Sequence, residues 1–463
     1  MSDQARFLEG SLMRHITVMA LTSSVGLMAV FVVDFIDMVF ISMLGRAELA
    51  AAIGYAGAVL FFTTSLGIGM AIAAGALVAR SLGAGDEDMA RRRAGTALVW
   101  GIVAGALFAG AVWWATPWLI AGLGASGETA ALAQHYLRII VPSLPILLAG
   151  MVGSAVLRAH GDASRAMMAT VWAALVNAVL DPILIFGLGL DLTGAALASV
   201  AARVAMAATA LWPLLRHHAG LDLPRLPELR ADVRPIMAIA LPAILTQLAT
   251  PIGSAIVTRA MAAEGEDAVA AMAIVGRLTP VAFAAIFALS GAIGPIVGQN
   301  FGAGRQDRVR GAIRDGLIFT VAVTLAVSLA LFLLRPGLAW LFSLDGEALR
   351  LVFLFAGPLS LLWFFNGVIF VGNAAFNNLG HPFYSTWINW GRHTVGTLLP
   401  ILALAPAFGA AGVLVGQSLG GVAFALLSLW LTDRLIREGR DPAAPRDPFR
   451  REAVQVRLFH GRR

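Results

Sequence analysis

The sequence repeats itself around two glycine-rich stretches, ARSLGAGDEDMAR at residues 79–91 and GQNFGAGRQDRVR at residues 298–310. Aligning the stretches pairs Gly83 with Gly302 and Gly85 with Gly304, an offset of 219 residues. The same offset aligns GSAVLRAHG at 153–161 with GNAAFNNLG at 372–380. A repeat over this distance predicts two similar halves. We interpret the GAG turns as helix ends followed by an N-cap such as Asp86, and not as phosphate-binding loops.

Composition predicts that both halves lie in a membrane. The 463 residues are 59% hydrophobic and 13% charged, with a mean hydropathy of +0.82. Apolar runs longer than about 18 residues recur, and each predicts a transmembrane helix. We expect about twelve spans, near residues 13–44, 50–80, 94–116, 134–157, 167–187, 195–215, 235–262, 269–300, 316–334, 349–376, 385–406 and 410–436. The predicted fold is an all-α membrane protein with two pseudo-symmetric six-helix lobes, related by an axis along the membrane normal.

The distribution of arginines predicts the orientation and the domain boundaries. All 33 basic residues are arginine, and with alternating spans most fall on the side that holds the N-terminus. The positive-inside rule therefore places both termini in the cytoplasm, as in a multi-pass protein of the bacterial inner membrane. We expect an N-terminal lobe at 1–220, a cytoplasmic linker at 221–234, a C-terminal lobe at 235–436 and a basic tail at 437–463. The tail suits anionic membrane lipids better than nucleic acid.

Missing residue types exclude several functions. Without lysine there is no Walker-type loop for nucleotide hydrolysis, and without cysteine no thiolate nucleophile, disulfide or iron–sulfur cluster. The histidines show no metal-ligand spacing, and no HExxH motif or nucleophile–base set is present. We therefore expect a protein that is not an enzyme and holds no cofactor or metal.

Three aspartates interrupt apolar runs and mark the candidate site. Asp34 and Asp37 lie in FVVDFIDMVF at 31–40, and Asp181 lies in WAALVNAVLDPILIF at 172–186. A charged residue near the bilayer centre costs at least about 2.5 to 3.5 kcal/mol, so such residues face a protein interior or an aqueous cavity. Helical spacing places Asp34 beside Asp37, and Asn177 beside Asp181.

The residue after Asp181 predicts a break in its helix. Pro182 removes a backbone donor and frees the carbonyl oxygen of Ala178, which adds an oxygen beside the carboxylates. Oxygen ligands of this kind suit a proton or sodium. Because the aspartates have no acidic counterparts in the second half, we expect ion coupling in the N-terminal half. The alternatives are that Asn177 only ties helices together and that Asp34 only hydrogen-bonds within the bundle.

Four stretches in order resemble the multidrug and toxic compound extrusion (MATE) family, closest to its prokaryotic DNA-damage-inducible-F branch. They are FIDMVFISMLGRAELAA at 35–51, RAHGDASRAMM at 158–168, NAVLDPILIFGLGLDLTGAALAS at 177–199 and GQNFGAGR at 298–305. The resemblance implies efflux of organic, often cationic, compounds in exchange for protons or sodium, by alternating access between two lobes. It implies small-molecule drugs as substrates, and we expect a monomer.

The resemblance also assigns residues. The family's cation site corresponds to Asp37, Asn177 and Asp181, with Tyr136 and Ser199 as supporting hydroxyls, whereas Asp34 stands where asparagine is commoner. Positions that are acidic in family members using the second lobe hold Gln247 and Asn366 or Asn373. We expect these three, with Arg277, to line the substrate cavity. Arg203, Arg277 and Arg392 lie within or near spans, where they either pair with acids or substrates or extend to the interface.

One feature departs from the family pattern. The proline common early in its first helix is replaced by Thr22, which questions bending of that helix.

The sequence thus predicts a secondary antiporter. One alternative is a flippase for lipid-linked sugars, which would need a cationic cluster for pyrophosphate. The other is a membrane enzyme, which would need the motifs that are missing.

Overall fold

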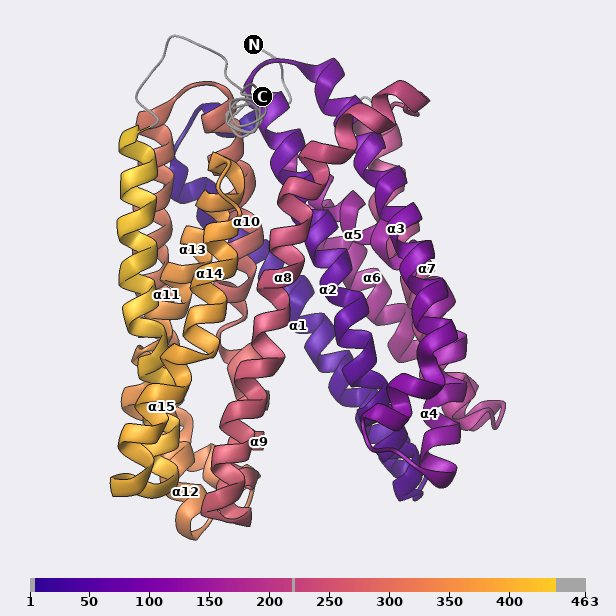
Figure 1. Ribbon diagram of the computed structural model, residues 1–463, viewed down its shortest axis with the longest axis vertical. Helices are drawn as coiled ribbons and strands as arrows, with labels where there is room; N and C mark the ends of the chain where they lie inside the picture. The colour runs from indigo at the N-terminus through magenta and orange to yellow at the C-terminus, as the bar shows by residue number, and fades with distance from the viewer. Residues whose placement is uncertain (1–4, 219–220, 439–463) are drawn as a thin grey trace, which may run out of the picture. The chain divides into compact units, whose positions relative to one another are not determined.

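The computed structural model describes residues 5–218 and 221–438 (Figure 1). These residues form helices joined by short turns, and no strand occurs among them. The chain folds into two compact units. Apart from the chain's ends, unit 1 comprises Thr22–Ala240, and unit 2 comprises Phe7–Leu21 together with the helices that follow Leu241.

Unit 1 is built around α5, which packs against α2, α3 and α7, while α6 packs against α7 (Figure 1). Glycines make the α5–α7 contact close, because a Cβ atom on Gly150 would lie 3.1 Å from the backbone nitrogen of Ala207. The helices of this unit are the later part of α1 (Leu12–Met43), α2 (Ala47–Gly83), α3 (Glu87–Gly122), α4 (Gly127–Ile140), α5 (Leu144–Ala159), α6 (Ala163–Pro182), α7 (Asp191–His217) and the first part of α8 (Leu226–Glu264).

Unit 2 is built around α13, which packs against α10, α11 and α15. Its helices are the start of α1, the later part of α8, α9 (Glu266–Ala282), α10 (Ala284–Gly302), α11 (Gln306–Leu341), α12 (Gly346–Leu354), α13 (Trp363–Leu379), α14 (Phe383–His393) and α15 (Val395–Glu438).

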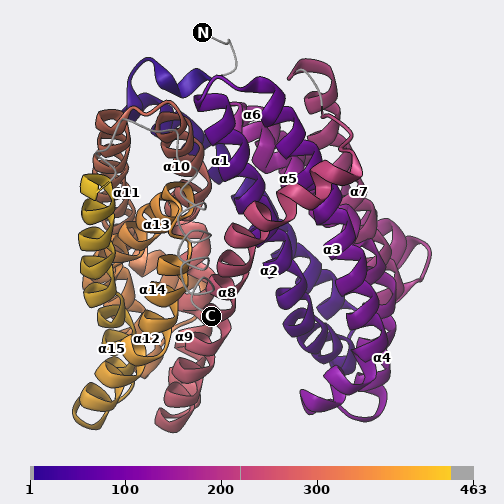
Figure 2. The same ribbon diagram turned by 45° about the horizontal axis from the view of Figure 1, so that its top comes forward.

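The segment Phe7–Leu21 belongs to unit 2, where its first residues lie beside α10 and α11 (Figure 2). The Phe7 backbone nitrogen donates to Gln299 Oε1 at 2.9 Å, and its carbonyl oxygen accepts from Asn300 Nδ2 at 3.1 Å. Arg308 donates to the carbonyls of Phe7, Glu9 and Gly10. Because these backbone groups precede α1, side chains from α10 and α11 satisfy them in place of a helical partner.

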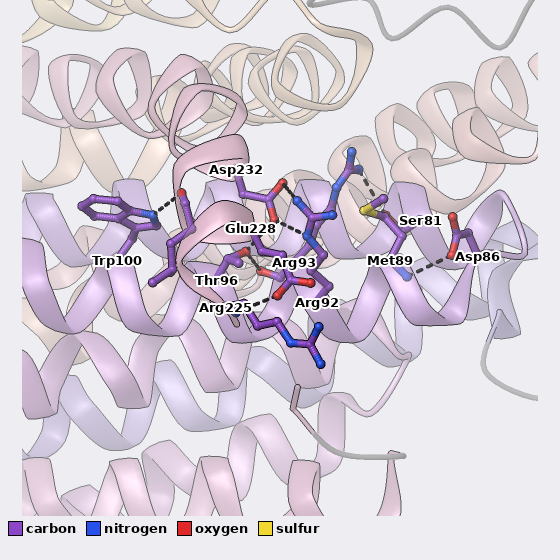
Figure 3. Close-up of polar contacts among 11 residues, drawn as sticks. Ser81, Asp86, Met89, Arg92, Arg93, Thr96, Trp100, Arg225, Glu228 and Asp232 are labelled. Atoms are coloured by element: carbon purple, nitrogen blue, oxygen red, sulfur yellow. Dashed lines mark hydrogen bonds and ion pairs between the residues drawn. The ribbon is translucent and has the colours of Figure 1, made fainter. Parts of the chain in front are cut away.

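The start of α8 is held within unit 1 by α3 (Figure 3). Asp232 is buried and accepts hydrogen bonds from Arg92 Nε at 3.2 Å and Thr96 Oγ1 at 3.1 Å. Trp100 Nε1 donates to the Leu229 carbonyl at 3.0 Å. These contacts explain why α8 begins at Leu226, earlier than the span predicted from residue 235.

The membrane-spanning fold agrees with the prediction. Within residues 5–218 and 221–438, ten helical stretches are long and apolar enough to cross a membrane, and the pair α12–α13, bent by 57°, makes eleven. The last of the ten, Phe383–Glu438, is 56 residues long and is broken at Gly409, where φ is 59°. Since one crossing needs about 20 residues, this stretch is long enough for the two spans predicted there.

Several predicted single helices are interrupted, among them two in which prolines lie close to the break. The stretch 134–157 contains a 3₁₀ turn at Val141–Ser143, because Pro142 and Pro145 remove backbone donors. The stretch 269–300 divides at Phe283, three residues after Pro280. Most of the tail predicted at 437–463 lies outside the described residues.

The interpretation of the GAG turns as helix ends is confirmed. Gly85 and Gly304 have φ angles of +76° and +71°, the left-handed region that glycine enters without strain. Asp86 then caps α3, because its side chain accepts from the backbone nitrogen of Met89 at 2.9 Å.

A second capping aspartate lies in the turn between α5 and α6, outside the spans. Asp162 is buried and accepts from the Arg165 backbone nitrogen at 3.1 Å, from Arg165 Nη1 at 2.6 Å and from His218 Nε2 at 2.9 Å. Burial alone would raise the pKa of Asp162, but the hydrogen bonds from His218 and Arg165 outweigh it and hold this pKa below its usual range. Burial lowers the pKa of the neighbouring His160 to about 4.

Asp162→Ala is expected to destabilise the protein more than Asp86→Ala. Asp86 is exposed and supplies only an N-cap, worth about 1 kcal/mol. Asp162 also satisfies His218 and Arg165, so its loss should cost about 2 to 4 kcal/mol. Thermal unfolding of the two purified variants in detergent measures the difference.

The sign of the pH dependence follows from the lowered pKa of Asp162. Its stabilising contribution is complete above the ordinary aspartate pKa and disappears as pH falls through the lower folded-state pKa. The stability gap between wild type and Asp162→Ala should persist from pH 8 to pH 5. A gap that closes within this range, or equal losses in both variants, would contradict the assignment.

Candidate functional site

Four helices of unit 1 contribute the predicted ion-site residues. Asp34 and Asp37 lie on α1, Tyr136 on α4, Asn177 and Asp181 on α6, and Ser199 on α7.

Asp37 and Asp181 come from helices far apart in sequence and form the centre of the site. Their carboxyl groups lie close enough to interact electrostatically. Asp181 is fully buried, and Asn177 Nδ2 donates to Asp181 Oδ1 at 3.4 Å. Asp37 Oδ1 and Asp181 Oδ2 are buried without a hydrogen-bond partner among the described residues. Two adjacent carboxylates repel each other strongly away from water, and a proton or cation bound between them would remove this repulsion.

Asp34 lies one helical turn from Asp37 and interacts with it electrostatically. Its side chain is exposed, whereas that of Asp37 is half-buried. Asp34 and Asp37 thus lie near each other, as their helical spacing predicted. Asp34 nevertheless lies at the edge of the site, whose centre is formed by Asp37 and Asp181.

Two hydroxyls lie near the carboxylates, and an arginine lies near one of these hydroxyls. Tyr136 is buried and forms a hydrogen bond with Ser199, within electrostatic reach of Asp37 and Asp181. Arg203 lies near Tyr136, and its Nη1 donates to the Ile140 carbonyl at 3.0 Å and to Ser143 Oγ at 2.8 Å. The sequence signal for Arg203 was a charge within the apolar span at 195–215, which did not reveal its position beside the site.

The helix carrying Asp181 is interrupted where its proline predicted. The regular part of α6 ends at Pro182, and the chain continues through a π-helical turn at Ile183–Gly187. The interruption ends the regular helix directly after Asp181.

The residues predicted for a substrate cavity lie in unit 2. Gln247 on α8 and Asn366 on α13 are half-buried, and Arg277 on α9 is exposed. Asn373 is buried, and its Oδ1 accepts from Asn389 Nδ2 at 3.1 Å. Asn366 Oδ1 accepts from Arg392 Nη1 at 2.5 Å.

Comparison with known proteins identifies the family. The MatE family model matches residues 23–183 and 242–402, the same 219-residue offset as the repeat. The chain is 29% identical over 447 residues to a protein named FAD transporter from Shewanella oneidensis, covering 94% of this chain and 95% of that one. It is 24% identical over 427 residues to the multidrug export protein MepA of Staphylococcus aureus, covering 90% and 93%.

A solved structure shows the same fold. An outward-facing multidrug resistance MATE family transporter superposes with a TM-score of 0.88 at 24% identity, covering 95% of this chain and 99% of that one. Because the family model matches both halves of the chain and helices long enough to cross a membrane recur, the chain belongs to the MatE family and is a multi-pass membrane protein.

Proposed function

We propose that this protein is a secondary antiporter that exports organic compounds in exchange for protons or sodium ions bound at Asp37 and Asp181. The observation that carries the proposal is the electrostatic interaction between these two carboxyl groups, each with a buried oxygen that has no partner among the described residues. Binding a proton or sodium ion removes the repulsion between them, and releasing it restores the repulsion. One ion taken up and given back therefore changes the packing energy of α1 against α6.

The neighbouring residues have supporting roles in this proposal. Asn177 holds Asp181 in place through its amide, Tyr136 and Ser199 supply hydroxyl oxygens, and Asp34 attracts cations towards the pair. In unit 2, Gln247, Asn366, Asn373 and Arg277 are proposed as polar contacts for the substrate. The protein would work as a monomer in the bacterial inner membrane, with both termini in the cytoplasm.

The relatives favour an exporter of small molecules over a flippase for lipid-linked sugars, because those compared above are named for multidrug export and FAD transport. These two names describe chemically different cargoes. The substrates to test here therefore include an aromatic organic cation and a phosphate-bearing aromatic compound.

Transport in liposomes tests the coupling. We expect purified protein to move ethidium against its gradient when a proton or a sodium gradient is imposed in the opposite direction. Each gradient is imposed alone, and an ionophore that dissipates the active gradient should stop transport. The proposal would be overturned for this cargo if ethidium transport did not depend on either gradient. It would also be overturned if no ethidium transport occurred under either gradient.

A further inference from the structure

Arg392, on α14 in unit 2, is a buried cation without an anionic partner among the described residues. Its side chain is one of the few charged groups in the buried part of the protein, at 9% exposure. Nη1 donates to Asn366 Oδ1, and the guanidinium lies 5.9 Å from the centre of the Phe370 ring. Nε is buried with no hydrogen-bond partner, and none of the ion pairs among the described residues includes Arg392.

This arrangement is energetically costly for a purely structural arginine. A guanidinium stays protonated in proteins, so it cannot escape burial by losing its charge. Burying an unpaired ion costs several kcal/mol. Burial of Arg203 in unit 1 costs less free energy, because its Nη1 donates to two acceptors, the Ile140 carbonyl and Ser143 Oγ. Arg392 has one neutral acceptor and leaves an edge of its guanidinium without a partner.

The surroundings hold the Arg392 side chain in a defined position. Asn366 and Phe370 lie four residues apart on α13, and therefore on one face of that helix. One orients Nη1 by a hydrogen bond, and the other lies beside the guanidinium plane as an aromatic ring. At the end of α14, Thr397 Oγ1 donates to the Arg392 carbonyl at 2.8 Å.

The unpaired edge of Arg392 has the geometry for a specific class of ligand. Nε and Nη2 point in parallel from one side of a guanidinium and match the two oxygens of a carboxylate or phosphate. A hydroxyl or carbonyl would satisfy one donor and leave the charge uncompensated. The flat ring of Phe370, 5.9 Å from the guanidinium carbon, favours an anionic group attached to an aromatic compound.

We propose that Arg392 is a substrate-specificity residue that binds the carboxylate or phosphate of an aromatic organic anion through its Nε–Nη2 edge. The inference rests on the proposed export function and names a substrate class for it, different from the organic cations expected from the family resemblance. Asn366 is then a positioning residue for Arg392.

Equilibrium binding with a matched pair of ligands tests the proposal. Riboflavin and riboflavin 5′-phosphate share one fluorescent aromatic ring and differ by the phosphate. Wild-type protein in detergent is expected to bind the phosphate form at least tenfold more tightly. Arg392→Gln should remove this preference by weakening the phosphate form at least tenfold, with riboflavin unchanged, and Arg392→Lys should keep part of it. Arg314→Gln is the matched control, because it removes the same charge in unit 2 from a side chain that is 73% exposed.

Three results would overturn the proposal. They are no preference for the phosphate form in wild type, equal weakening of both flavins by Arg392→Gln, and the same loss in Arg314→Gln. If Arg392→Gln does not fold, the proposal is tested by two remaining results. These are the preference of wild-type protein for the phosphate form and the partial retention of this preference in Arg392→Lys. Binding needs no ion gradient, so loss of coupled transport would contradict the antiport proposal without changing this result.

Discussion

Asp181→Asn is expected to abolish ion-driven efflux, and Asp37→Asn should do the same. Asparagine has nearly the size of aspartate but cannot take up or release a proton, and it binds sodium more weakly because it carries no charge. Either substitution also removes the repulsion between the two side chains, so the change in packing energy between the loaded and empty states disappears. We expect at least a tenfold loss of gradient-driven transport in each variant.

Matched aspartates in unit 1 separate this effect from a general loss of charge. Asp191 begins α7 with a φ of 46°, a conformation that asparagine also adopts readily. Asp191→Asn should therefore transport like wild type. Asp34→Asn should have an intermediate effect, because Asp34 is exposed and acts on Asp37 only through its charge.

The measurement is efflux of a fluorescent substrate from everted membrane vesicles, with variant amounts matched by immunoblot. Facilitated movement down a substrate gradient should survive in Asp37→Asn and Asp181→Asn, since coupling and not the pathway is removed. Unchanged gradient-driven transport in both variants would eliminate the pair as the coupling site.

The fold could be predicted largely from the repeat and the apolar runs, because a membrane leaves helices as the only way for a long apolar segment to satisfy its backbone. The helix ends at Gly85 and Gly304 were also predictable, since their conformation is local. The placement of Phe7–Leu21 in unit 2 was not, because it depends on Gln299 and Arg308, distant in sequence.

In the candidate site, too, features set within one helix were predictable, and features set by contacts between helices were not. The spacing of Asn177 and Asp181 predicted their contact, because one helix fixes it. The proximity of Asp37 to Asp181 was only a hypothesis, since helix packing brings α1 to α6. That Arg392 is buried without an acid was not predictable, because an arginine within an apolar run is compatible with pairing, with substrate binding and with extension to the interface.

Gly194→Ala is expected to cause a large loss of both stability and coupled transport. A Cβ atom at Gly194 on α7 would lie 2.7 Å from the Leu184 carbonyl carbon and 2.9 Å from the Ile185 nitrogen. Both belong to the backbone of the π-helical turn that directly follows Pro182, so no side-chain rotation relieves the clash. Overpacking of this kind costs about 1 to 3 kcal/mol.

The same clash should move Asp181, because the displaced turn is joined to it through Pro182 alone. Gly187→Ala is the matched control: it lies in the same turn, and its nearest added contact is the Pro182 carbonyl oxygen at 4.0 Å. The thermal unfolding temperature and the rate of gradient-driven efflux should both fall in Gly194→Ala. Both should stay near the wild-type values in Gly187→Ala. Wild-type transport in a stably folded Gly194→Ala protein would mean that the α7 contact does not position Asp181. If transport is lost but stability is not, the substitution has moved the Asp181 carboxyl group without weakening the packing of α6.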